Sequence, residues 1–206
     1  MNHKPTSVKV IYWMTNVIFW IFAVASIFAI FFAGALIIGL LDKTQLHVGM
    51  PVAMNLNETG LLEYNGQSVD VEFVEMYGKI HFIDAPSAVT RIFGVFMLLA
   101  LSMGLYIFMT FKKFITNVYH GAYFDRSNIF LLKRISYALI GFWLFAVFYA
   151  MFQKFYFLKH LTYESIHVSG EYQTFNGVLI AALLLWVLSH IFQKGVELER
   201  ENELTI

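Results

Sequence analysis

Four long apolar stretches constrain this chain more than any other feature of its sequence. They occupy residues 10–41, 89–111, 129–157 and 175–192. A helix needs about 20 apolar residues to cross the hydrocarbon core of a bilayer. The sequence therefore predicts an all-α membrane fold, a four-helix transmembrane bundle formed as a single domain over residues 1–206. The first stretch is about twice the length of a signal peptide's apolar region, so we interpret it as a retained span.

Composition agrees with the membrane class and removes several chemistries. Charged residues make up 14% of the chain, against about 25% in soluble domains. There is no cysteine, which excludes disulfides, thiolate metal sites and cysteine nucleophiles. We find no hydrolase, phosphate-loop or dinucleotide motif, so we expect a protein that is not an enzyme and has no cofactor.

The distribution of Lys and Arg predicts the orientation of the spans. Cytoplasmic loops of membrane proteins carry an excess of these residues. With the N-terminus inside, the cytoplasmic side holds nine of them and the outer side five. We therefore expect a multi-pass protein of the cell membrane with both termini in the cytoplasm. The nine are Lys4, Lys9, Lys112, Lys113, Arg126, Lys133, Arg134, Lys194 and Arg200.

The first outer segment, residues 42–88, differs from the rest of the chain. Residues 61–73 alternate apolar and polar side chains on either side of Asn65-Gly66, a strong signal for a β-hairpin. Tyr77-Gly78 suggests a further turn before a strand at 79–83, and 48–56 suggests another strand. Residues 162–168 of the second outer loop are also strand-like. We expect the two loops to pair into one small extracytoplasmic β cap.

The connection between the second and third spans has two readings. Residues 112–123 form either an amphipathic helix at the membrane surface or an ordinary tight connection. Gly121 is placed to end a helix with a left-handed residue, and Asp125 or Ser127 to cap the third span. After the fourth span, residues 193–206 predict an acidic helical tail, which is either a solvated face or a dock for a basic partner.

Small and polar residues inside the spans give little sign of a transport path. No charge lies near the middle of any span, where its cost would mark a functional site. Ala25, Ala29 and Ala33 recur every four residues and allow close helix packing, either within the chain or in a homo-oligomer. Four outer histidines, with Glu164 or Asp84, would bind zinc or copper if the loops met, but we expect no metal: His47, His81, His160 and His167.

Two cytoplasmic segments resemble an uncharacterised bacterial family of four-span membrane proteins. In residues 121–135 the shared pattern is a Gly, then Phe, then Asn, then Leu followed by a basic residue. Residues 191–206 resemble the family's C-terminus, which ends in Leu-Thr-Ile or Leu-Thr-Val. The outer segment 42–88 departs from the compact members. The matching positions are candidate partner-binding residues: Gly121, Phe124, Asn128, Lys133, Arg134, Gly195, Glu197, Leu198 and Glu201.

Members of that family are often encoded beside a small helix-turn-helix regulator. The resemblance therefore implies a sensor or regulatory partner of a cytoplasmic DNA-binding protein, with no direct contact to nucleic acid. The acidic tail has the charge that would bind a basic DNA-reading surface. The alternative is a small oligomeric transporter or an immunity or efflux protein. Ion or solute flux in liposomes that is lost in the Ala29→Leu variant would support this alternative. A membrane enzyme is the third hypothesis.

Overall fold

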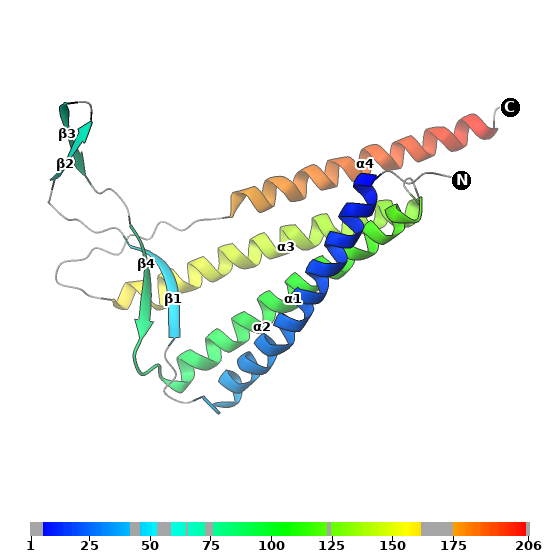
Figure 1. Ribbon diagram of the computed structural model, residues 1–206. Helices are drawn as coiled ribbons and strands as arrows, with labels where there is room; N and C mark the ends of the chain where they lie inside the picture. Colours follow the sequence, from blue (N-terminus) through cyan, green and yellow to red (C-terminus); the bar gives the residue numbers. More distant parts are fainter. Residues whose placement is uncertain are drawn as a thin grey trace.

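Four long helices make up most of the chain in the computed structural model (Figure 1). The structure describes residues 6–41, 46–52, 59–64, 66–72, 76–122, 125–161 and 175–204. Each of the four helices is long and apolar enough to cross a membrane, so the predicted four-span fold is confirmed. The helices are α1 (Thr6–Ile38), α2 (Ser87–Tyr119), α3 (Arg126–Tyr156) and α4 (Asn176–Leu204), and α3 is followed by a single 3-10 turn, η1 (Leu158–His160).

The helices pack in chain order, α1 on α2, α2 on α3 and α3 on α4. Because they alternate in direction, the start of α1 and the end of α4 lie at the same end of the molecule (Figure 1). The connection between α2 and α3 lies there too, and we call this end the turn end. The opposite end carries the strands and is called the cap end.

Among the described residues, the cap consists of four strands, all from the segment between α1 and α2. The hairpin predicted around Asn65-Gly66 is confirmed, since β2 pairs with β3, Tyr64 lies opposite Gln67, and Gly66 has a φ of +76°. In Figure 1 this hairpin stands apart from the helices. The bounds are β1 (Leu46–Val52), β2 (Thr59–Tyr64), β3 (Gln67–Glu72) and β4 (Met76–Phe82), and β1 pairs with β4 in antiparallel register.

Two expectations about the cap change. The predicted turn at Tyr77-Gly78 is wrong, because β4 continues through both residues. They lie opposite Pro51 and Met50 of β1, and this strand pairing outweighs the turn tendency of a lone glycine. The expected pairing with the second outer loop concerns residues 162–168, which lie outside the described residues.

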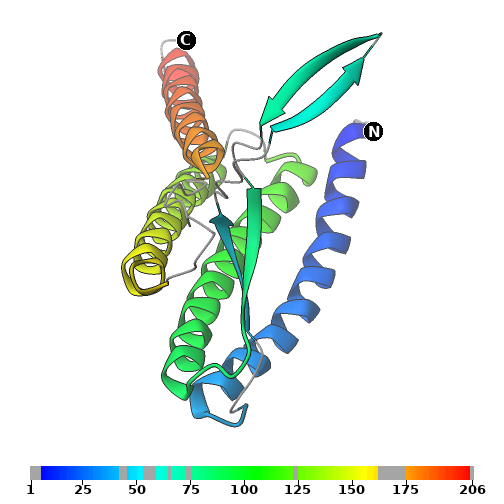
Figure 2. The same cartoon turned by 90° about the vertical axis from the view of Figure 1, so that its left-hand side faces the viewer.

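An aromatic cluster fixes β4 to the helices. Phe157, just after α3, is 7% exposed and packs against Ile80 and Phe82 of β4 and Val89 and Phe93 of α2. The centroid of its ring lies 5.4 Å from that of Phe82 and 5.5 Å from that of Phe93. Figure 2, which looks at the cap end, shows the β1–β4 pair in front of the helices. Through this cluster, strand β4 contacts the start of α2 and the residue that follows α3.

Close packing of α1 on α2 depends on one glycine. A Cβ added at Gly94 would lie 2.8 Å from Ile37 Cγ1 and 2.9 Å from the carbonyl oxygen of Ala33. Of the three alanines on α1 with candidate packing roles, Ala33 is fully buried, Ala29 is half-buried and Ala25 is exposed. The contact within the chain therefore uses the cap-end member of the alanine series.

Candidate functional site

Helix α2 ends in a tight turn that is fixed by backbone hydrogen bonds over the described residues 117–122. Helix α2 continues unbroken to Tyr119, so no separate surface helix exists over 112–119 and the tight connection is observed. The N–H of Gly121 donates to the carbonyl of Val118, and the N–H of Ala122 donates to the carbonyl of Asn117. This pattern requires a left-handed residue after the helix, and Gly121 supplies it with a φ of +94°.

A buried asparagine locks the turn from the side of α3. Asn128 is 1% exposed, accepts a hydrogen bond from Asn117 Nδ2 at 2.8 Å, and donates its own amide to the carbonyl of Ala122. The spacing of Gly121 and Asn128 that resembles the family pattern therefore builds the turn itself. The Asn128 side chain is enclosed, so any effect it has on a partner would act through the shape of the turn.

Asp125 starts α3, as its position in the sequence predicted. Its carboxylate accepts hydrogen bonds from the hydroxyl and the backbone N–H of Ser127. These bonds, the hydroxyl first, hold the pKa of the Asp125 carboxyl below its ordinary value. The cap is therefore ionised at neutral pH and fixes where the helix begins.

A chain of polar side chains joins α3 to α4 at this end. Lys133 Nζ donates to Gln193 Oε1 at 2.7 Å, and Gln193 Nε2 donates to Glu197 Oε1 at 3.0 Å. The other carboxylate oxygen of Glu197 pairs with Lys194 at 2.7 Å. Further along the interface, the Ser136 hydroxyl donates to the carbonyl of Ala182. The position of α4 is thereby fixed relative to α3.

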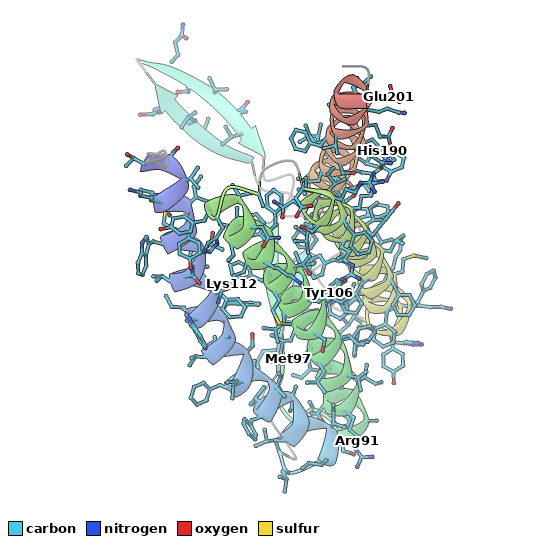
Figure 3. All side chains as sticks on the ribbon, turned by 90° about the vertical axis from the view of Figure 1, so that its right-hand side faces the viewer. Arg91, Met97, Tyr106, Lys112, His190 and Glu201 are labelled. Carbon is cyan, nitrogen blue, oxygen red and sulfur yellow. The ribbon has the colours of Figure 1, made fainter. Side chains whose placement is uncertain are left out.

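The remaining candidate residues lie on exposed surface or outside the described part. Arg134 is exposed, with its guanidinium 4.3 Å from the centre of the Phe130 ring. Leu198 is 58% exposed, Gly195 and Glu201 are also exposed, and a Cβ at Gly195 would meet nothing within 4 Å. Phe124 lies outside the described residues. Figure 3 shows Glu201 and His190 along α4, which is helical to Leu204 as predicted.

Charged residues mark how far the helices extend beyond the apolar core. Twenty residues separate Arg91 from Lys112 on α2, and nineteen separate Arg134 from Lys154 on α3. At about 1.5 Å per residue each interval measures about 30 Å, the thickness of the hydrocarbon core. The last turns of α2 and the first turns of α3 lie outside these two intervals.

Five of the ten buried apolar residues among those described lie in or beside these turns. These five residues are only 3–9% exposed, whereas many large apolar side chains in the middle of the helices are exposed. Burial of these apolar side chains stabilises the packing of α2 and α3 at the turn end. The five residues are Ile115, Ile129, Leu131, Leu132 and Ile135.

The histidines of the outer segments do not gather into a metal site among the described residues. His47 and His81 lie opposite each other in the β1–β4 register, and His160 is exposed in η1. No group of three or more metal-binding side chains occurs in the part of the chain that the structure describes. Glu164 and His167 lie outside it.

The sequence reading missed three structural features: the Asn117–Asn128 bond, the Phe157 cluster and the Gly94 contact. Each joins residues from different helices or strands. Periodicity marked the apolar faces but did not specify which faces meet. Only the Gly121–Asn128 spacing gives a signal, through the predicted helix-ending role of Gly121 and the family resemblance that makes both residues candidates for partner binding.

The fold and these contacts define a multi-pass membrane protein with a β cap at one end and a locked helical turn at the other. Residues 74–206 match the family described as protein of unknown function (DUF2975), and the chain belongs to that family. The matched part begins just before β4 and contains α2, α3 and α4. No curated protein and no solved structure matches the chain.

Proposed function

We propose that the protein is a non-enzymatic membrane sensor that passes a condition at the cap end to a cytoplasmic DNA-binding regulator at the turn end. One observation carries this proposal. The α2–α3 pair is clamped at both ends, by β4 and Phe157 at the cap end and by Asn117 and Asn128 at the turn end. A rigid pair of helices held in this way is suited to transmit a displacement across the membrane.

The input would arrive at the cap. The β2–β3 hairpin places Leu62, Val69 and Val71 on one face, all at least 41% exposed. The other face carries Glu63 and Asp70 together with Leu61, which is 71% exposed. An exposed, two-faced hairpin is a suitable surface for an envelope component. Movement of the cap would displace β4, and α2 begins five residues after the end of β4.

The output would leave through the turn and the end of α4. The bonds from Lys133 through Gln193 to Glu197 link α3 to the charged end of α4. The excess of Lys and Arg at the turn end supports a cytoplasmic location for it, in a bacterial inner membrane. A regulator would then meet the turn and the acidic end of α4 together.

Co-purification tests the proposal. The full chain and a variant lacking residues 197–206 are expressed with the helix-turn-helix regulator that this proposal expects beside the gene, and the amount of regulator recovered is measured. We expect the deletion to remove most of the recovered regulator, and Ser68→Ala, an exposed change on the hairpin, to leave recovery unchanged. Equal recovery with and without residues 197–206 would contradict docking at the end of α4.

A second arm tests transmission. Phe157→Ala loosens the cap from α2 and α3 without touching the turn end. If the two ends are coupled, this variant changes the amount of regulator recovered while the protein remains folded in detergent. A folded Phe157→Ala protein that binds the regulator as the unmodified chain does would contradict transmission but leave docking intact.

A further inference from the structure

Lys112 has an unusual setting for a cation in a membrane protein. Its side chain is half-buried, and its ammonium lies 4.0 Å from the centre of the Phe19 ring and 5.2 Å from the centre of the Trp20 ring, both on α1. Figure 3 shows Lys112 on the side of α2 that faces α1. Aromatic faces attract a cation but neutralise none of its charge.

No carboxylate on either packed helix balances this charge. Helices α1 and α2 contain no Asp or Glu, while their turn-end halves carry Lys9, Lys112 and Lys113. Two acidic side chains described at this end are engaged elsewhere, Asp125 with Ser127 and Glu197 with Lys194. Partial removal of a cation from water is costly without a counter-charge, and neither of these two helices supplies a carboxylate.

The depth of Lys112 indicates which anion is available. The twenty residues between Arg91 and Lys112 span about 30 Å, so Lys112 lies at the boundary between hydrocarbon and headgroups. Phosphates of the lipid headgroups lie at this boundary, and Trp20 is of the residue type enriched there. A basic residue at this depth attracts anionic lipid.

We infer that the phosphate of an anionic phospholipid binds Lys112 between α1 and α2, with Phe19 and Trp20 beside the ammonium. The lipid would bridge the two helices at the turn end. There the ring of Tyr12 of α1 stacks on the ring of Tyr119 of α2, with the ring centroids 4.2 Å apart. Lipid charge would thereby favour the packed arrangement of α1 on α2. This site is independent of the regulator surface on α3 and α4.

Native mass spectrometry of the full chain in detergent tests the inference. Phosphatidylglycerol is titrated into the unmodified protein, Lys112→Gln and Lys113→Gln, and singly lipid-bound protein is measured. Lys113 is the matched control, because it is the neighbouring lysine and is exposed. We expect Lys112→Gln to weaken binding about fivefold and Lys113→Gln less than twofold. Lys112→Arg should restore most of the binding.

Three results would overturn the inference. Equal weakening by Lys112→Gln and Lys113→Gln would indicate general attraction to a basic surface. Phosphatidylcholine that binds as tightly as phosphatidylglycerol would remove the requirement for a net negative lipid. Inorganic phosphate that displaces the lipid at equal concentration would make free phosphate the ligand. Circular dichroism of each variant checks that the helices are retained, so that loss of binding is not loss of fold.

Discussion

Gly94→Ala should separate α1 from α2, because its new methyl group has no room. The added Cβ would lie 2.8 Å from Ile37 Cγ1, 2.9 Å from the Ala33 carbonyl oxygen and 3.2 Å from Leu36 Cβ. The Ile37 side chain can turn away, but the carbonyl is fixed in the hydrogen bonds of α1. Relief therefore requires the helices to move apart, and overpacking of this kind costs about 1–3 kcal/mol.

A matched control isolates the packing cost. Gly34→Ala also replaces a helical glycine, but a Cβ at Gly34 would meet nothing within 4 Å. Both variants gain the same helix propensity, about 1 kcal/mol for Gly to Ala, so their difference reports packing alone. The free energy of unfolding, measured by titration from mild detergent into sodium dodecyl sulfate, should be about 1–3 kcal/mol lower for Gly94→Ala than for Gly34→Ala.

Two measurements test the close approach of α1 and α2 at Gly94. Adding Ile37→Ala to Gly94→Ala should recover part of the loss but not all of it, because the Ala33 carbonyl remains in the way. Equal free energies of unfolding for Gly94→Ala and Gly34→Ala would refute the close approach of α1 and α2 at this point.

Three further predictions concern the two ends of α2 and α3. Asn128→Ala leaves buried partners unsatisfied and should lower the free energy of unfolding by about 1–3 kcal/mol, whereas an equally stable variant would exclude the turn lock. Phe157→Ala should cost about 3–5 kcal/mol and speed amide exchange in β4, and unchanged exchange there would contradict the clamp. Because the pKa of Asp125 is lowered in the folded protein, its ionised carboxylate stabilises the fold at neutral pH, and this stabilisation is lost as the pH falls below about 4. Asp125→Asn should therefore make the melting temperature depend less on pH in the acid range.

Local signals in the sequence were sufficient for the spans, the hairpin and the helix ends. Hydrophobic length defines a span without any partner, and Asn65-Gly66 defines a two-residue turn from backbone preference alone. Gly121 and Asp125 behaved as predicted for the same reason. Each of these features is decided by a few neighbouring residues.

Features that join distant residues could not be predicted in the same way. The pairing of β4 with β1 cancelled the turn expected at Tyr77-Gly78, and periodicity gave no sign of that partner. Asn128 is recognisable as a lock only once Asn117 and Ala122 are beside it. The Phe157 cluster likewise gathers rings from a strand and two helices, among 22 phenylalanines in the chain.

Cysteine labelling in intact cells tests most directly that the β cap and the turn end lie on opposite sides of the membrane. The chain has no native cysteine, so single substitutions report one position each. A membrane-impermeant maleimide should modify Ser68→Cys in the hairpin at once, and Gly195→Cys in α4 only after permeabilisation. Modification of both positions in sealed cells would contradict the account.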